Sequence, residues 1–168
     1  QREISKEIYQ RSKLNVFVSP LHREKISNMM NLKLEEGYVL RPLINTNNFY
    51  NIKIERDIEN LFVGVISEAK GFLNLKEMSK EKNITLIGKK EDGIDIDFGD
   101  YLGFVSQEDL PKYYNRAKNF IYLPRWPEPQ GRVVVEAALC GCNLITNYNV
   151  GATSFEFDIG NPENLKNV

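Results

Sequence analysis

Residues 119–141 read NFIYLPRWPEPQGRVVVEAALCG. The apolar run from Asn119 to Leu123 predicts a buried strand, and the apolar stretch from Gly131 to Cys140 predicts the helix that follows it. The loop between them carries Glu128, and Glu136 lies about one turn into the helix. The first N–H groups of a helix lack intrahelical acceptors and can bind an anion. Gly131, at the start of this helix, has no side chain that would block such a site. We therefore expect this unit to bind a phosphorylated ligand whose hydroxyl groups meet the two carboxylates.

The chain from residue 60 onward repeats the same alternation of elements. Short apolar runs separated by helical patterns are typical of a parallel sheet covered on both faces. We predict a doubly wound, Rossmann-like α/β fold, with strands at 61–66, 84–88, 101–103, 119–123 and 143–146 and helices at 71–81, 107–117 and 131–140. Ligands of such sheets bind at the carboxyl ends of the strands. We therefore expect one crevice to be formed by the loops 64–71, 88–90, 103–105 and 124–131.

The N-terminal part of the chain follows a different pattern. Amphipathic helices are predicted at 1–13 and 21–30, with a short buried strand at 15–19 between them. Residues 37–42 have the composition of another strand, which ends at a proline. Residues 44–57 contain four asparagines without a clear period. This composition indicates an irregular loop or linker, and it places a domain seam there.

Composition excludes several classes of function. Lys and Arg total 22 and Asp and Glu total 23, for a net charge of -1, so no basic field would attract nucleic acid. No apolar run approaches the roughly 20 residues of a membrane-spanning helix, and residues 1–13 do not resemble a signal peptide. Cys140 and Cys142 are too close for an ordinary disulfide and lack partners for a metal site. We expect reduced thiols, no bound metal and a soluble, cytoplasmic chain.

Two interpretations fit the position of Glu136. A carboxylate there can accept hydrogen bonds from the vicinal hydroxyls of a ribose. It can also simply favour the helix N-terminus, by about 0.3–1 kcal/mol, and pair with Arg132 one turn earlier. Glu128 lies on the loop and can reach the hydroxyls of a sugar attached to the phosphate.

The stretch from Leu123 to Gly141 resembles, position by position, the donor-site signature of a known enzyme family. These are the retaining GT-B glycosyltransferases of the large mannosyl- and glucosyltransferase family (glycosyltransferase group 1, family 4). In that family two glutamates with seven residues between them flank a glycine loop. Glu128 and Glu136 have that separation, and Gly131 and Gly141 stand where the family has glycine.

The resemblance extends to three earlier loops and implies a role for each. Phe62 to Gly71 is similar to the family's first donor loop, and Leu86 to Gly88 with Gly103 to Ser106 resemble the two loops that follow. The resemblance implies that the base edge is met near Phe104 and Val105. It also implies that Glu136 binds the ribose and Glu128 the transferred sugar. The residues implied at the phosphates are Lys70, Gly64 and the amides of Gly131, Arg132 and Val133.

One position departs from the family pattern. The family usually has arginine directly after the glycine of the first loop, where it shares the phosphates with lysine, and here that residue is Val65. Arg125 and Arg132 stand where the family usually has uncharged residues. We hypothesise that one of these two arginines supplies the missing charge. The alternative is that Arg132 pairs with Glu136 or is solvated.

The resemblance also implies a missing half of the enzyme. Residues 1–36 resemble only the last helix, strand and helix of an N-terminal acceptor domain, with Ser19 in the place of a serine that the family often has. Residues 37–168 are then the donor-binding domain, with its closing helices truncated after a helix start at Asn161 and Pro162. The missing domain would bind a glycan or lipid-linked acceptor and could contact the inner face of the membrane. We expect little transfer by the chain alone.

The family further implies a nucleoside-diphosphate sugar as donor, with neither cofactor nor metal. A lysine and a helix N-terminus can neutralise the departing diphosphate. Two alternatives remain open. The first is a GT-B-like epimerase or phosphorylase, which uses the same fold. The second is a non-catalytic nucleotide-binding module, which the loss of the cation at Val65 favours.

Overall fold

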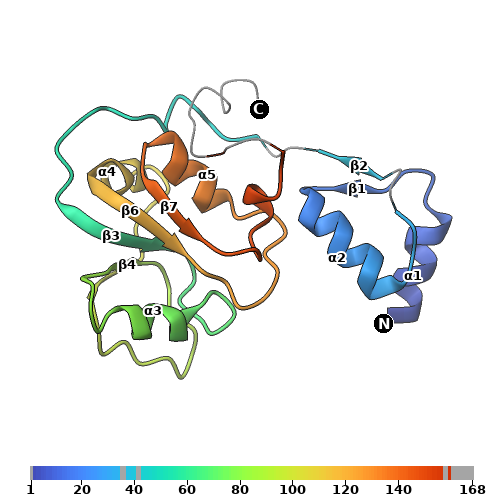
Figure 1. The fold of residues 1–168 in the computed structure, drawn as a ribbon, viewed down its shortest axis with the longest axis horizontal. Helices are drawn as coiled ribbons and strands as arrows, with labels where there is room; N and C mark the ends of the chain where they lie inside the picture. The colour runs from blue at the N-terminus through green and yellow to red at the C-terminus, as the bar shows by residue number, and fades with distance from the viewer. Residues whose placement is uncertain (1, 35–36, 41–42, 157–158, 160–168) are drawn as a thin grey trace.

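The computed structural model describes residues 2–34, 37–40, 43–156 and 159. A five-stranded parallel sheet forms the larger part (Figure 1), with the strand order β5-β4-β3-β6-β7. Its strands are β3 (Ile58–Val63), β4 (Thr85–Ile87), β5 (Asp100–Gly103), β6 (Ala117–Tyr122) and β7 (Asn143–Thr146). The order starts at the central strand β3, moves outward to one edge and returns to the other side through β6. This doubly wound order confirms the predicted fold class.

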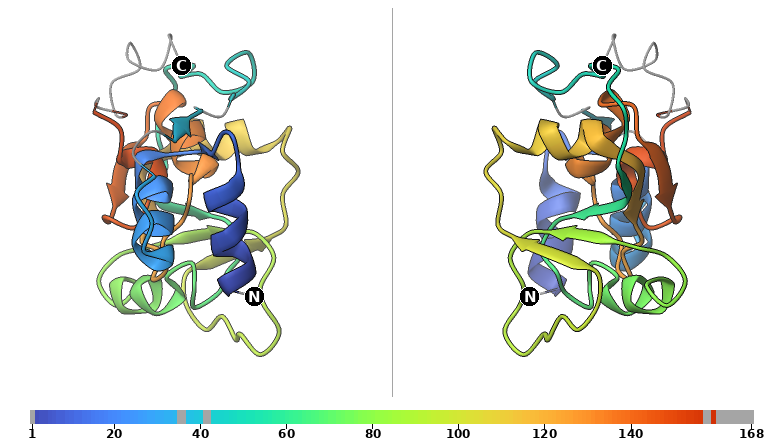
Figure 2. Two further views of the ribbon diagram at one scale, coloured as in Figure 1. Left: turned by 90° about the vertical axis from the view of Figure 1, so that its right-hand side faces the viewer. Right: turned by 90° about the vertical axis from the view of Figure 1, so that its left-hand side faces the viewer.

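Helices cover both faces of this sheet. α4 (Leu110–Arg116) and α5 (Arg132–Leu139) lie on one face, and α3 (Phe72–Met78) lies on the other (Figure 2). β3 and β6 are apolar on both faces because they lie in the middle of the sheet; Leu61, Phe62, Phe120 and Ile121 are all fully buried. The apolar runs of the sequence therefore mark the strands that lie between the two helix layers.

Element boundaries differ from the predicted ones by a few residues. β3 begins at Ile58, three residues earlier than predicted, because Ile58 is buried and pairs with Ala117 of β6. α4 begins at Leu110 instead of 107, since Ser106 and Asp109 form a turn in which the Ser106 hydroxyl donates to the Asp109 carboxylate at 2.8 Å. Such side-chain bonds compete with the first helical turn.

The N-terminal part forms a smaller unit beside the sheet. It contains α1 (Arg2–Arg11), β1 (Val16–Phe17), α2 (Pro20–Met30) and β2 (Tyr38–Val39), and β1 and β2 pair in parallel. These elements confirm the predicted helices and short strand. The helix start predicted at Asn161 and Pro162 lies outside the described residues.

The segment 43–57 contains no helix or strand, as predicted, but it packs on the larger unit. Phe49 is buried, and its ring meets that of Tyr114 edge to face at 6.0 Å. The backbone N–H of Ile52 donates to Asn115 at 2.9 Å. The irregular loop is therefore part of the core of the sheet domain and is not a free linker.

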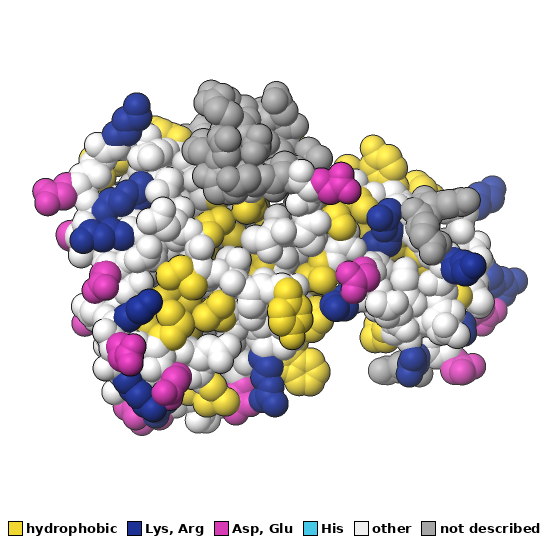
Figure 3. All heavy atoms as spheres, in the orientation of Figure 1, with side chains coloured by type: hydrophobic (Ala, Val, Ile, Leu, Met, Phe, Trp, Pro, Cys, Tyr) yellow, Lys and Arg dark blue, Asp and Glu magenta, His cyan; other side chains and the backbone are white. Residues whose placement is uncertain are grey.

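The surface has no single dominant charge. In the view of Figure 3, lysine, arginine and carboxylate side chains lie mostly around the outline, and hydrophobic side chains are exposed nearer the middle. Within the described ranges, no helix combines the length and the apolar character needed to cross a bilayer.

Candidate functional site

Three of the four predicted loops meet at the carboxyl ends of β3, β4 and β5. The N–H of Gly64 donates to the carbonyl oxygen of Ile87 at 2.9 Å, and the N–H of Gly88 donates to that of Gly103 at 2.8 Å. Gly88 has a φ of 141°, and a Cβ there would overlap the backbone of Gly64. Glycine is therefore required where these loops approach each other.

The fourth loop leads from β6 into α5 and is held at Glu128 by two backbone hydrogen bonds. The N–H of Glu128 donates to the carbonyl oxygen of Asn149 at 2.7 Å, and the N–H of Gly151 donates to that of Glu128 at 2.9 Å. Gly131 precedes the helix with a φ of 77°, and a Cβ there would lie 3.0 Å from the Val150 side chain. The amides of Gly131, Arg132 and Val133 thus stand at the N-terminal end of α5, where an anion is favoured.

The structure brings Lys70 and Glu128 together. Nζ of Lys70 forms an ion pair with Oε2 of Glu128, and the hydroxyl of Tyr122 donates to the same oxygen at 3.1 Å. The Glu128 side chain is 17% exposed and that of Lys70 is 33% exposed, so solvent still reaches the pair. Burial, and then the charge of Glu128, raise the pKa of Tyr122 far above its usual value, which keeps the phenol protonated as a donor.

Glu136 occupies a deeper position with a different set of partners. Its side chain is only 3% exposed. Gln107 donates to Oε1 at 3.0 Å, Tyr114 donates to Oε2 at 3.1 Å, and the Arg132 guanidinium lies 3.9 Å from Oε1. Burial and the nearby Glu136 charge raise the pKa of Tyr114 well above its usual value.

Sequence reasoning missed three donors to the two carboxylates, namely Gln107, Tyr114 and Tyr122. Tyr114 lies in α4 and Gln107 in the turn before it, and both reach Glu136 because α4 packs on α5. No spacing in the sequence indicates that contact. Tyr122 could have been found, since it is the last polar group before the end of the strand that precedes Glu128.

The two arginines each have an acidic partner. Arg125 lies 3.4 Å from Glu68 in an exposed pair, and Arg132 forms the ion pair with Glu136 that the sequence offered as an alternative. Val65, in the position of the family arginine, is 47% exposed. A longer side chain at this position would therefore have room.

The residues predicted to meet the base lie after β5. Phe104 is 69% exposed, and the ammonium group of Lys89 lies 5.4 Å from the centre of its ring. Val105 and Val133 are partly buried against the core. Phe104 thus offers an exposed aromatic ring beside Val105. Val133, which the resemblance implies at the phosphates, lies in the first turn of α5.

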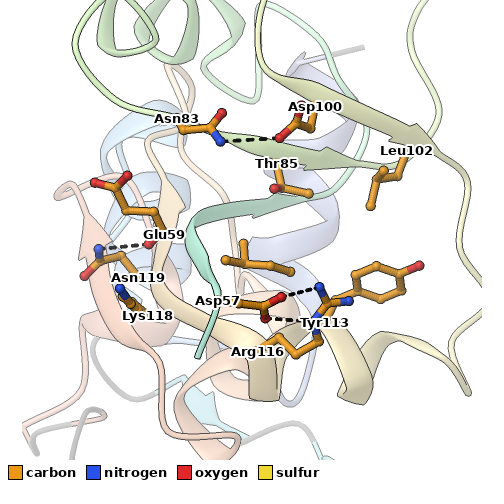
Figure 4. A pocket seen from close by; sticks show the side chains of 11 residues that line it. Asp57, Glu59, Asn83, Thr85, Asp100, Leu102, Tyr113, Arg116, Lys118 and Asn119 are labelled. Carbon is orange, nitrogen blue, oxygen red and sulfur yellow. Dashed lines mark hydrogen bonds and ion pairs between the residues drawn. The ribbon is translucent and has the colours of Figure 1, made fainter. Parts of the chain in front are cut away.

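A pocket of about 900 Å³ lies at the opposite edge of the sheet (Figure 4). It is lined by residues from the amino ends of the strands, including Asp57, Glu59, Asp100 and Arg116. Arg116 donates to both carboxylate oxygens of Asp57, at 2.8 and 2.6 Å, so these charges already satisfy each other. Parallel sheets bind ligands at the carboxyl ends of their strands, so the carboxyl edge, and not this pocket, is the candidate site.

The carboxyl edge combines groups that suit a nucleotide-sugar. It offers an ammonium group, a helix N-terminus, two hydrogen-bonded carboxylates and an exposed aromatic ring. Among the described residues, no group of three or more His, Cys, Asp or Glu side chains is arranged to hold a metal ion.

Solved structures with a similar fold include glycosyltransferases and a synthase. A sucrose-phosphate synthase from Thermosynechococcus elongatus superposes with a TM-score of 0.74 at 19% identity, over 90% of this chain and 45% of that one. Anabaena Alr3699/HepE in complex with UDP and glucose gives 0.74 at 17% identity, over 90% and 49%. The pneumococcal O-GlcNAc transferase GtfA, in complex with UDP and GlcNAc, gives 0.66 at 11% identity, over 87% and 32%. The chain thus spans less than half the length of these three proteins.

The comparison with curated protein sequences returned no match. The sequence model of the family Glycosyl transferases group 1 matches residues 45–155, which include the whole sheet and all four loops. The chain therefore belongs to the group 1 glycosyl transferases.

Proposed function

We propose that this chain is the donor-binding half of a retaining glycosyltransferase. It would transfer a hexose from a nucleoside-diphosphate sugar to a glycan or lipid-linked acceptor. The observation that carries the proposal is the Lys70–Glu128 pair beside the N-terminus of α5. A cation and helix amides suit the phosphates of such a donor, and the neighbouring carboxylate suits its sugar, which supports the proposal.

Each part of the donor has a group of suitable chemistry. Lys70 and the amides of Gly131 to Val133 would bind the diphosphate. Glu128 would accept hydrogen bonds from the transferred sugar, and Glu136 from the ribose. When the diphosphate leaves, the sugar becomes oxocarbenium-like and negative charge grows on the phosphate, so fixed donors there lower the barrier. We propose that this transfer needs neither metal nor cofactor, because Lys70 and α5 meet the charge.

The similar structures support a nucleotide-sugar as the ligand. Anabaena Alr3699/HepE was solved with UDP-glucose as well as with UDP. The likeness extends over 99% of this chain in the UDP-glucose complex, at 17% identity. We therefore choose UDP and UDP-glucose as the first probes, with GDP and ADP beside them.

The remaining parts of the proposal concern segments beyond the sheet. We propose that residues 1–36 belong to an acceptor-binding domain and that residues 37–168 bind the donor. The acceptor domain would close over the donor and make any contact with the inner face of the membrane. Since transfer needs both reactants in one closed cleft, the 168-residue chain alone should transfer little sugar.

One observation favours a second candidate function. Val65 stands where the family usually has a phosphate-binding arginine. A nucleotide-binding module without catalytic activity would tolerate the loss of that cation. Such a module would bind the bare nucleotide as well as the nucleotide-sugar, with no role for Glu128. An epimerase would release free nucleoside diphosphate from the nucleotide-sugar without any acceptor.

Calorimetry with UDP, GDP, ADP and their glucose conjugates tests the proposal. One diphosphate should bind, and Lys70→Ala and Glu136→Ala should each weaken that binding by about tenfold or more, as expected for a charged partner. The matched controls Lys118→Ala and Glu59→Ala line the pocket at the opposite edge and should bind like wild type. The proposal fails if no diphosphate or sugar conjugate binds, or if the four variants behave alike.

A further inference from the structure

Tyr122 holds Glu128 by a single oxygen, and Lys70 meets that same oxygen. The phenol donates to Oε2 at 3.1 Å, and the Lys70 ammonium group pairs with Oε2. Among the described residues, no hydrogen bond engages Oε1. The carboxylate is therefore fixed against the lysine while one oxygen remains for a ligand hydroxyl.

The ring of Tyr122 cannot move far from this position. It is 3% exposed and stacks between Phe62, at 6.0 Å and 16°, and Phe120, at 6.2 Å and 13°. The Lys70 ammonium group lies 6.0 Å from the centre of the same ring. A phenylalanine would keep this stacking and remove only the O–H, so the hydroxyl can be tested without disturbing the core.

We propose that Tyr122 is a positioning residue that holds Glu128 against Lys70, and that this arrangement makes the site discriminate in favour of the nucleotide-sugar over the bare nucleoside diphosphate. The inference rests on the proposed function. It assigns a role to Tyr122 and a second role to Glu128, as the group that weakens binding of the product.

The charges give the reason for this discrimination. Glu128 neutralises Lys70, so a bare diphosphate meets a half-buried carboxylate beside the only lysine of the first loop. Its terminal phosphate carries an extra negative charge and offers no hydroxyl donor to Glu128, so the two groups repel. The nucleotide-sugar carries less charge on that phosphate, and its sugar hydroxyls donate to Glu128. The same carboxylate therefore attracts the donor and weakens the binding of the product.

The test is the ratio of two dissociation constants, measured by calorimetry for whichever of UDP, GDP or ADP binds and for its glucose conjugate. Glu128→Gln removes the negative charge. It should lower the dissociation constant of the bare diphosphate by about threefold or more and raise that of the sugar conjugate by about tenfold. Tyr122→Phe should raise the dissociation constant of the sugar conjugate by about tenfold and change that of the bare diphosphate by less than about twofold.

Three further variants show whether the effect is specific. Glu59→Gln and Tyr113→Phe line the pocket at the opposite edge and should change neither constant. Tyr114→Phe removes a buried phenol from Glu136, and it should weaken both ligands in the same proportion because both contain the ribose. Thermal unfolding of every variant confirms that it is folded.

Each outcome decides for or against the inference. If Glu128→Gln weakens only the sugar conjugate and Tyr122→Phe changes neither dissociation constant, the inference is wrong and the proposed function stands. If neither variant changes the ratio while the diphosphate binds, the inference is wrong and the nucleotide-binding module is favoured over the proposed function. A proportional loss for both ligands in Tyr122→Phe would show that the phenol is merely structural. If none of the six ligands binds, the proposed function fails and this inference fails with it.

Discussion

The hydroxyl of Ser19 donates a hydrogen bond to the carbonyl oxygen of Pro129, the residue that follows Glu128. The same hydroxyl accepts a bond of 3.0 Å from the N–H of His22, and so caps the N-terminus of α2. Ser19 is fully buried. One side chain thus joins the N-terminal unit to the loop that carries the proposed sugar-binding carboxylate.

Ser19→Ala should therefore affect both stability and donor binding. It removes a helix cap and a buried bond to the loop, which should lower the free energy of unfolding by about 1–3 kcal/mol. Glu128 should become less well fixed, so nucleotide-sugar affinity should fall by several-fold. Urea unfolding and calorimetry measure the two effects. Ser12→Ala, at the exposed end of α1, is the control; equal losses in both variants would contradict a special role of Ser19.

Arg56 joins the ends of two helices and should be important for stability. Its guanidinium donates to the carbonyl oxygens of Tyr114 at 3.1 Å, Cys140 at 2.7 Å and Ala117 at 2.5 Å. Arg56→Ala should lower the free energy of unfolding by about 2–3 kcal/mol, because carbonyl groups of both helix C-termini lose a charged donor. Arg11→Ala, which breaks an exposed ion pair within α1, should change it by less than about 1 kcal/mol. Urea unfolding compares the two variants.

Arg56 also illustrates which features the sequence can and cannot predict. The sheet, its helices and the carboxyl-edge loops follow from short apolar runs and helical periods, which are local signals. The loop 44–57 has no such signal, and its role depends on Phe49 and Arg56 meeting residues 58 or more positions away. Contacts of that kind are decided by tertiary packing and leave no period in the sequence.

The candidate site divides in the same way. Lys70, Glu128 and the glycine before α5 could be named from the resemblance, and the structure places Lys70 on Glu128. Tyr122, which donates to Glu128, and Tyr114, which donates to Glu136, come from strand and helix positions that look like ordinary core. A phenol in an apolar run indicates burial, and only the fold shows that its hydroxyl reaches a carboxylate.

The two thiols should make the fold sensitive to alkali. Burial raises the pKa of Cys140 to about 12 and that of Cys142 to about 11. An unfolded thiol ionises near pH 8.5, so above that pH the unfolded chain releases protons that the folded chain keeps. The contribution of the thiols to the free energy of unfolding should be complete below about pH 8.5. Above that pH, the free energy of unfolding should fall by up to about 1.4 kcal/mol per pH unit for each thiol. Urea unfolding at pH 8, 9 and 10 measures this loss.

The variant Cys140→Ala with Cys142→Ala is the comparison for the alkaline experiment. It should lose less stability over the same pH range, even though its stability at pH 8 is lower. The native thiols should also react slowly with a disulfide reagent at pH 8, because only the thiolate reacts and both groups are buried. Fast reaction of the folded chain, or identical pH slopes, would show that the thiols do not titrate on unfolding.

Val65→Arg should strengthen diphosphate binding. Val65 directly follows Gly64 at the carboxyl end of β3 and is 47% exposed, so an arginine there can extend without displacing core atoms. Its guanidinium would add a second cation to a site where Glu128 neutralises Lys70. We expect the affinity for the bound diphosphate to rise by about tenfold, with a steeper dependence on salt. Calorimetry at two salt concentrations measures both.

The matched control and the two arginines decide how this result is interpreted. Leu102→Arg adds the same charge at a residue that is 46% exposed and lines the pocket at the opposite edge, so it should leave affinity unchanged. If Arg125 or Arg132 already supplies the missing charge, Arg125→Ala or Arg132→Ala should weaken binding in the wild-type chain, and Val65→Arg should restore it. No gain from Val65→Arg, together with wild-type affinity in both alanine variants, would mean that the diphosphate lies away from the first loop.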